Sequence, residues 1–219
     1  MSLIAIVGGG PSQYIPENFY EDVSFWIGAD GGAQVLLERG MRVDLAIGDF
    51  DSVTSDTLRK IKEEAYETKV YSREKDETDL ELAVQEAISK GADHILFYGV
   101  TGGRMDHTLA NIQLLYPMIQ QNLKGTIVDR QNEMEVKLPG VHTVEYSDDY
   151  PYVSFIPLSL KVKSLSLQGF KYHLEAEDLP IGSTLCLSNE LEKETGTYSF
   201  EEGIVLTIKS RDAAPHIPE

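Results

Sequence analysis

Residues 45–52 of this chain read Leu-Ala-Ile-Gly-Asp-Phe-Asp-Ser, an apolar run that ends in glycine and acidic residues. The apolar part is typical of a short buried strand, and the polar part begins where that strand should end. Three further clusters have a similar place in the pattern: Ala-Asp-Gly-Gly at 29–32, Lys-Asp-Glu-Thr-Asp at 75–79 and Thr-Gly-Gly-Arg-Met-Asp-His at 101–107. Ligands of an open α/β sheet bind at the carboxyl ends of its strands, so the clusters predict a ligand site there.

Strand and helix patterns alternate through the first part of the chain, which predicts a mostly parallel, Rossmann-like α/β sheet with right-handed crossovers. The expected strands are 3–7, 24–28, 44–47, 67–71, 94–98 and 125–129. The expected helices are 33–38, 55–65, 80 to the glycine at 91, and 109–119. Pro117 should kink or shorten the last of these helices.

The pattern changes after about residue 129, where the helix signals stop. Segments at 133–138, 141–146, 152–156, 160–167 and 204–208 alternate with period two, and turn residues such as Gly169 and Gly196 separate them. Short strands of this kind predict an antiparallel sandwich or barrel. We therefore expect two domains, 1–130 and 131–219, with a short tail at 213–219 that is loosely held.

The composition narrows the possible partners. The 36 acidic and 19 basic residues give a formal charge of -17, which disfavours nucleic acid and anionic membranes as partners and suits Mg2+ or a cationic substrate. Cys186 is the sole cysteine, so no intrachain disulfide can form, and we expect it to be a small buried side chain in a strand. No signal peptide or membrane-spanning run is evident, and we expect a cytoplasmic protein.

Asp49 and Asp51 follow the strand predicted at 44–47. In an extended segment their side chains would point to the same side, where two carboxylates repel each other unless a cation lies between them. Aspartate and serine also favour turns. The pair therefore indicates either a metal site or a turn.

Residues 75–79 precede a strongly patterned helix. Thr78 as N-cap and Glu81 three residues later fit a capping box, and Asp79 in the first turn complements the helix dipole. Asp76 lies before the helix and is not explained by capping. Lys75 is placed either to contact phosphate oxygens or to pair with a nearby carboxylate.

Thr101, Gly102 and Gly103 lie between a strand and a helix, where glycine amides can approach an anion. Arg104 can add a forked donor to phosphate, and Asp106 can cap the helix.

His107 and Asn111 share one face of that helix. Asp30, Gly31 and Gly32 also lie between a predicted strand and a predicted helix. Asp30 is placed either to accept hydrogen bonds from a nucleotide or to cap the helix.

Taken together, the four clusters resemble thiamine pyrophosphokinase, and Ser188-Asn189 matches the Ser-Asn pair near the thiamine site of that family. The resemblance implies an α/β ATP-binding domain at 1–130 followed by an antiparallel β-sandwich at 131–219 that binds thiamine. It also implies a homodimer with thiamine between one subunit's β domain and the other's α/β domain. The implied reaction converts ATP and thiamine into thiamine diphosphate and AMP, with Mg2+.

The resemblance carries roles over to single residues. The implied catalytic carboxylates are Asp49, Asp51, Asp76 and Asp79, and the first three are the implied metal ligands. The implied nucleotide residues are Asp30, Gly31, Gly32, Lys75, Thr78, Thr101, Gly102, Gly103, Arg104, Asp106 and His107. Ser188 and Asn189 would contact thiamine. Independently of the resemblance, the chemistry allows a carboxylate to accept the proton of the thiamine hydroxyl, and the candidates are Asp76 and Asp51.

Two other functions fit part of the pattern. Asp49-Phe50-Asp51 also looks like the D-x-D site of a metal-dependent nucleotide-sugar transferase, which leaves the other clusters unexplained. A non-catalytic thiamine or nucleotide sensor would need the same fold without turnover. Gly8-Gly9-Gly10-Pro11-Ser12 does not match G-x-G-x-x-G and no P-loop motif occurs, which disfavours a Rossmann dehydrogenase and a P-loop kinase.

Overall fold

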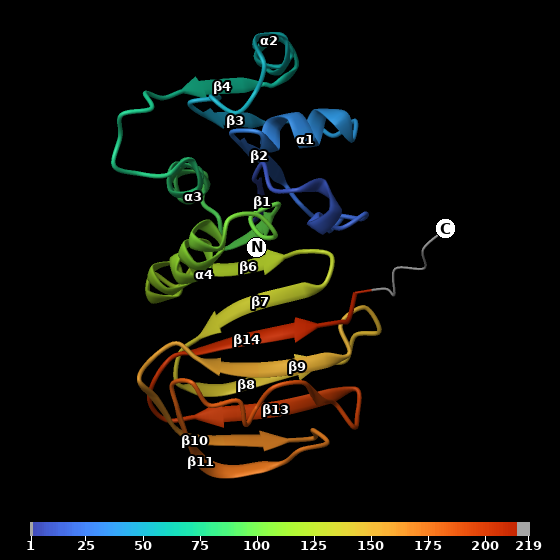
Figure 1. Ribbon diagram of the computed structural model, residues 1–219, viewed down its shortest axis with the longest axis vertical. Coiled ribbons are helices and arrows are strands. Elements are labelled where there is room, and N and C mark those ends of the chain that lie inside the picture. Colours follow the sequence, from blue (N-terminus) through green and yellow to red (C-terminus); the bar gives the residue numbers. More distant parts are fainter. Residues whose placement is uncertain (1, 214–219) are drawn as a thin grey trace. The chain divides into compact units, whose positions relative to one another are not determined.

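The computed structural model describes residues 2–213, which divide into two compact units between Arg130 and Gln131 (Figure 1). Most of the tail that we expected to be loose, from residue 214 onward, lies outside the described residues. Among the residues described, no helix has the length and apolar character needed to cross a membrane.

The first unit is an α/β structure in which strands and helices alternate. Its strands are β1 (Leu3–Val7), β2 (Phe25–Ala29), β3 (Leu45–Gly48), β4 (Glu67–Val70), β5 (His94–Tyr98) and β6 (Lys124–Val128). Its helices are the 3-10 turn η1 (Ser12–Tyr14) and the α-helices α1 (Gly32–Glu38), α2 (Ser55–Glu64), α3 (Asp79–Ser89) and α4 (Met105–Gln120).

These six strands are all parallel and have the order β6-β5-β1-β2-β3-β4. The chain builds outward from β1 to β4 and then returns to the other side of β1 with β5. Helix α1 lies on one side of the sheet and helices α3 and α4 on the other (Figure 1). This reversal makes the region beside β1 a topological switch point, where open α/β sheets bind their ligands.

Helix α4 is longer than the sequence predicted. It begins at Met105 and passes through Pro117 to end at Gln120, so the expected shortening at Pro117 is wrong. The proline lies in the last turn, where its missing N–H removes one bond from a helix that is about to end.

The second unit is a β-sandwich. Its strands are β7 (Asn132–Lys137), β8 (Gly140–Glu145), β9 (Tyr152–Pro157), β10 (Lys161–Gln168), β11 (Leu174–Pro180), β12 (Asn189–Glu190), β13 (Thr195–Phe200) and β14 (Val205–Ser210). They form the antiparallel groups β12-β9-β14-β7 and β11-β10-β13-β8, which enclose a core that includes Phe155, Leu165, Phe170, Tyr198 and Val205. The predicted fold class, an α/β region followed by an antiparallel β-sandwich, is confirmed.

Two expectations in the sandwich are wrong. Gly196 lies inside β13 rather than in a turn. A Cβ there would come within 2.3 Å of Leu191 and 2.7 Å of the Phe170 ring, so glycine is required by close packing of a strand. Cys186 is buried as expected, but it lies in a turn, where its carbonyl accepts a hydrogen bond from Phe155.

Candidate active site

Three aspartates gather at the carboxyl end of the parallel sheet. Asp30 directly follows β2, Asp49 directly follows β3, and Asp79 is the first residue of α3. One carboxylate oxygen from each lies within 4.8 Å of those of the other two, and all three residues are half-buried. Three negative charges this close together repel one another unless a cation or a proton lies among them.

Asp30 carries the clearest sign that a partner belongs at this place. Its Oδ2 accepts a 2.5 Å hydrogen bond from Ser52, whereas its Oδ1 is buried without a hydrogen-bond partner, the one such side-chain atom in residues 2–213. A buried carboxylate oxygen without a partner is costly, and a bound cation would satisfy it.

The alternative capping role that we considered for Asp30 is wrong. Gly31 is the N-cap of α1 and no side chain caps that helix end, while Gly32 is its buried first residue. Asp30 itself has a positive φ of 49°, an unusual conformation for a residue other than glycine. The backbone here turns the carboxylate toward Asp49 and Asp79 rather than toward the helix amides.

Asp49 and Asp51 do not lie in an extended segment, so that expectation is wrong. Phe50 between them is buried and has a φ of 57°, and the amide of Asp51 donates to Oδ1 of Asp49 over 3.1 Å. The turn interpretation is therefore confirmed, and Asp49 belongs to the three-aspartate group as well. Asp51 instead forms an ion pair with Arg73 at 3.1 Å and lies outside that group.

The start of α3 places Asp79. The predicted capping box is present, because Thr78 accepts from the amide of Glu81 and the Glu81 carboxylate accepts from the amide of Thr78. Asp76 precedes this box, is exposed, and has no hydrogen bond or ion pair within residues 2–213. The structure thus brings Asp79 to Asp49 and leaves Asp76 in solvent.

Lys75 is paired with one of these aspartates. Its Nζ lies 2.5 Å from Oδ1 of Asp79 and 5.4 Å from the centre of the Tyr71 ring. Burial raises the pKa of the Asp79 carboxyl above its ordinary value, the Lys75 ammonium opposes that rise, and the charges on Asp49 and Asp30 add to it. Of the two roles considered for Lys75, pairing with a carboxylate is the one that the structure contains.

Two side-chain hydrogen bonds hold the glycine-containing loop that follows β5. The Thr101 hydroxyl donates to the buried Asp129 carboxylate over 2.8 Å, and the Asn111 amide donates to the carbonyl of Val100 over 2.8 Å. Gly102 has a φ of 79°, and a Cβ there would lie 2.1 Å from the Tyr14 ring. Gly102 is therefore required by packing against Tyr14, whereas Gly103 has room around it.

The polar residues at the start of α4 are exposed. Arg104 is the N-cap, so the role of N-cap that we considered for Asp106 is wrong. Arg104 forks onto the Asp106 carboxylate at 2.5 and 3.1 Å, and this pairing lowers the pKa of Asp106 to about 2. His107 is exposed and its amide donates to Asp106. An anion at this helix end would compete with Asp106 for the Arg104 donors.

Ser188 and Asn189 lie in the second unit, where the side chain of Asn189 serves the backbone. Its Oδ1 accepts from the amides of Tyr172 and Glu190, and its Nδ2 donates to the carbonyl of Tyr172 over 2.8 Å. Ser188 has a φ of 52° and its amide donates to Ser154. These bonds fix the backbone of Tyr172, whose side chain is exposed. The sequence pattern did not single out Tyr172, because the exposure of an aromatic residue in a loop is not visible in sequence.

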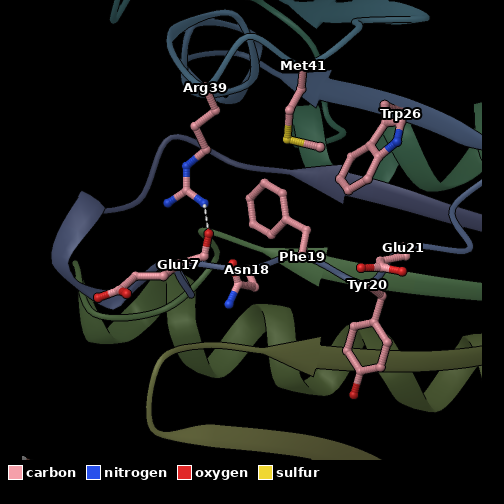
Figure 2. Close-up of a pocket in the computed structure, with 8 residues that line it drawn as sticks. All are labelled: Glu17, Asn18, Phe19, Tyr20, Glu21, Trp26, Arg39 and Met41. Atoms are coloured by element: carbon pink, nitrogen blue, oxygen red, sulfur yellow. Dashed lines mark hydrogen bonds between the residues drawn. The ribbon is translucent and has the colours of Figure 1, made fainter.

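A separate hollow of about 690 Å3 is lined by the residues that precede β2 in the chain, by Trp26 of β2, and by residues that directly follow α1 (Figure 2). The Phe19 ring lies at its centre, with Arg39 stacked over the ring at 4.6 Å and Trp26 beside it at 5.4 Å. None of the predicted site residues lines it. The hollow is lined at the amino end of β2, whereas Asp30 follows the carboxyl end of that strand.

Comparison with known proteins identifies relatives along nearly the whole chain. The family model described as "Thiamin pyrophosphokinase, catalytic domain" matches residues 16–127, and that described as "Thiamin pyrophosphokinase, vitamin B1 binding domain" matches residues 141–205. The thiamine pyrophosphokinase of Bacillus subtilis is 44% identical over 214 residues, which cover 97% of this chain and 100% of the relative.

Solved structures of similar proteins have the same fold. The crystal structure of the Bacillus subtilis thiamine pyrophosphokinase superimposes with a TM-score of 0.90 at 41% identity, over 97% of this chain and 100% of that one. The thiamin pyrophosphokinase of Geobacillus thermodenitrificans gives a TM-score of 0.85 at 42% identity, over 97% of this chain and 99% of that one.

Proposed function

This chain belongs to the thiamine pyrophosphokinase family, and from that premise we propose that Asp30, Asp49 and Asp79 hold the Mg2+ that acts with its ATP. The reaction transfers the pyrophosphoryl group of ATP to the hydroxyl of thiamine and gives thiamine diphosphate and AMP. The observation that carries the metal assignment is the buried, unpartnered Oδ1 of Asp30. The proposed ligands differ from Asp49, Asp51 and Asp76, the set expected from sequence, in all but Asp49.

The donor set fits Mg2+ rather than a softer metal. Only carboxylate oxygens face one another in this group, and hard divalent cations prefer oxygen ligands. Mg2+ usually binds through a few carboxylates together with substrate phosphates, which suits a site that lies half-buried beside the phosphate-binding edge of the sheet. When bound, the metal would neutralise charge that develops on the phosphates during transfer.

Residues of the chain supply the remaining contacts in this proposal. Lys75 and Arg104 provide cationic donors to the phosphate oxygens, and the backbone amides near Gly103 approach the same anion. Thr101 acts indirectly, because its hydroxyl is already bonded to Asp129 and holds the loop. We propose that Asp76 accepts the proton of the thiamine hydroxyl. Asp51 is paired with Arg73, whereas Asp76 has no partner within residues 2–213.

The thiamine end of the reaction belongs to the second unit. We propose that the exposed Tyr172 ring packs on an aromatic ring of thiamine and that Asn189 keeps Tyr172 in place. Ser188, exposed beside them, would contact the same substrate.

We also propose that the chain works as a homodimer with thiamine between two subunits, as the family resemblance implies. Under this arrangement, one site needs Asp30 from one subunit and Tyr172 from the other. Mixing subunits of the inactive variants Asp30→Asn and Tyr172→Ala should restore up to about one quarter of the wild-type activity, because half of the dimers would carry one intact site. No recovery after exchange, with a monomer in sedimentation, would contradict the shared site.

ATP as substrate and a lone, unpaired Cys186 support a cytoplasmic location in this proposal. Locating a tagged chain in cell fractions tests it, and recovery outside the cytoplasm would contradict it.

Product identity tests the proposed reaction. Incubation with ATP, Mg2+ and thiamine should give AMP and thiamine diphosphate in equal amounts, and Asp49→Asn should abolish both while the circular dichroism spectrum stays unchanged. ADP as the only nucleotide product would contradict pyrophosphoryl transfer. Turnover of a nucleotide sugar with Mn2+, or ligand binding without any turnover, would instead support the transferase and sensor alternatives raised by the sequence.

A further inference from the structure

We infer that Lys75 is a built-in counter-cation of the three-aspartate site, and that it competes with the metal for Asp79 until nucleotide phosphates draw its ammonium away. This inference rests on the proposed metal site at Asp30, Asp49 and Asp79. Its consequence is that the metal binds weakly to the protein alone and tightly together with the nucleotide.

The contact between Lys75 and Asp79 is close and largely shielded from solvent. The Lys75 side chain is 14% exposed and the Asp79 side chain 23%, and their charged atoms are 2.5 Å apart. Lys69 on β4 pairs with Glu86 on α3 at 2.7 Å, and this lysine is more exposed than Lys75, at 33%. Screening by water is therefore weaker at Lys75 than at a typical surface pair.

The position of the ammonium conflicts with a metal at the same oxygen. Mg2+ binds carboxylate oxygens at about 2 Å, so an ion bound to Oδ1 of Asp79 would lie within about 4 to 5 Å of Nζ even in the most open arrangement. A doubly charged ion and an ammonium at that separation repel each other strongly. Either the metal does not bind Oδ1 of Asp79, or the Lys75 ammonium moves away from that oxygen.

The charges explain why the site carries a lysine at all. Without Lys75, three carboxylates within 4.8 Å of one another would face one another with no cation between them. With Lys75 the metal-free site has a net charge of -2, and with Mg2+ as well its net charge is zero, so the carboxylates no longer repel a polyphosphate. The Tyr71 ring, 5.4 Å from Nζ, offers the displaced ammonium a second contact.

The test is metal affinity without catalysis. Mn2+ binding is measured by electron paramagnetic resonance or calorimetry, with the protein alone and with α,β-methylene-ATP, whose bond between the α and β phosphorus atoms cannot be cleaved. Lys75→Met should bind Mn2+ alone about tenfold or more tightly than the wild type, and the nucleotide analogue should improve its metal affinity much less than it improves that of the wild type. Lys75→Arg keeps the charge and should keep the weak, nucleotide-dependent binding.

A matched control removes the lysine of the other ion pair made to a carboxylate of α3. Lys69→Met breaks the pair with Glu86, about 10 Å along α3 from Asp79, and should leave Mn2+ affinity unchanged. A thermal-stability readout covers the case in which Lys75→Met folds poorly: the metal-free variant should melt lower than the wild type and should regain that loss when Mg2+ is added. Lys75→Gln provides a second neutral variant.

The outcomes separate this inference from the proposed site. Equal or weaker Mn2+ binding by Lys75→Met and Lys75→Gln, with binding still abolished by Asp30→Asn, would overturn the role of Lys75 and leave the metal site standing. Mn2+ binding that is unaffected by Asp30→Asn would overturn the proposed site itself.

Discussion

Asp30 combines three features that a structural role alone does not explain. Its backbone has a positive φ, one of its carboxylate oxygens is buried without a partner, and two other carboxylates lie within 4.8 Å. Each feature is unfavourable in the metal-free chain, and a cation would relieve the second and third. Strained and unsatisfied groups of this kind concentrate at functional sites.

Asp30→Asn tests this reading at the residue scale. The amide can still accept from Ser52 and has almost the same shape, so the metal-free protein should melt at the same temperature as the wild type or higher. Millimolar Mg2+ should raise the melting temperature of the wild type by a few degrees and that of Asp30→Asn not at all, and turnover should fall at least about 100-fold.

Asp76→Asn is the matched comparison, because Asp76 belongs to the metal set expected from sequence and not to the three-aspartate group. It should keep the Mg2+-dependent rise in melting temperature. Loss of that rise in Asp76→Asn and its retention in Asp30→Asn would show that the metal ligands are assigned to the wrong aspartates.

His142 on β8 gives a prediction about pH. Burial lowers the pKa of its ring, while its bond to the Leu138 carbonyl at 2.8 Å and the charge on Glu135 oppose the shift and the charge on Lys137 adds to it. A depressed pKa means that the folded state resists protonation, so its contribution to stability is fully present above the ordinary value of 6.5 and falls as the pH drops through it.

The measurement compares the wild type with His142→Phe, which keeps an aromatic ring beside Tyr198 and Phe200. The difference in free energy of unfolding should be constant above neutral pH and should shift in favour of the variant as the pH falls to about 5. A difference that stays flat over this range would remove His142 as a titrating group.

At the scale of elements, the capping box at Thr78 links helix stability to the position of Asp79. Thr78→Ala should lower the free energy of unfolding by about 1 kcal/mol and should also reduce turnover severalfold, because Asp79 is the next residue.

Thr54 caps α2 with a bond of the same 3.2 Å length, and none of the three aspartates lies in α2. Thr54→Ala should lose similar stability and keep its turnover. Equal turnover in the two variants would show that the cap of α3 does not position the site.

Gly196 in β13 tests the packing of the sandwich. Gly196→Ala should cost about 1 to 3 kcal/mol in unfolding free energy, since the added methyl group would meet Leu191 and Phe170. Gly103→Ala, where the nearest atom to the added group is 3.8 Å away, should change stability by less than about 0.5 kcal/mol. Chemical denaturation of both variants gives the comparison, and equal stabilities would contradict the packing account.

Periodicity in the sequence predicted the parallel strands and the helices of the first unit, because each is a continuous apolar run or a helical stripe. It did not predict β11, whose residues are mostly exposed, or β13, where close packing puts a glycine inside a strand. The clusters predicted a site at the strand ends, where the three-aspartate group lies, but which aspartates join that group depends on the left-handed turn at Phe50. That turn directs Asp51 toward Arg73, and a pattern of residue types does not reveal it.

At the scale of the whole molecule, the chain has a charge of -17 and a three-carboxylate group at the carboxyl edge of a parallel sheet. Its two units match the catalytic and vitamin B1 binding models of one family. We propose that Asp30, Asp49 and Asp79 bring the metal to the nucleotide.

Crystals grown with Mn2+ and α,β-methylene-ATP would show the position of the metal through its anomalous scattering. We expect an anomalous peak about 2.2 Å from carboxylate oxygens of Asp30, Asp49 and Asp79, with nucleotide phosphate oxygens completing the coordination shell. A metal bound by Asp51 and Asp76, with Asp30 and Asp79 outside the coordination shell, would contradict it.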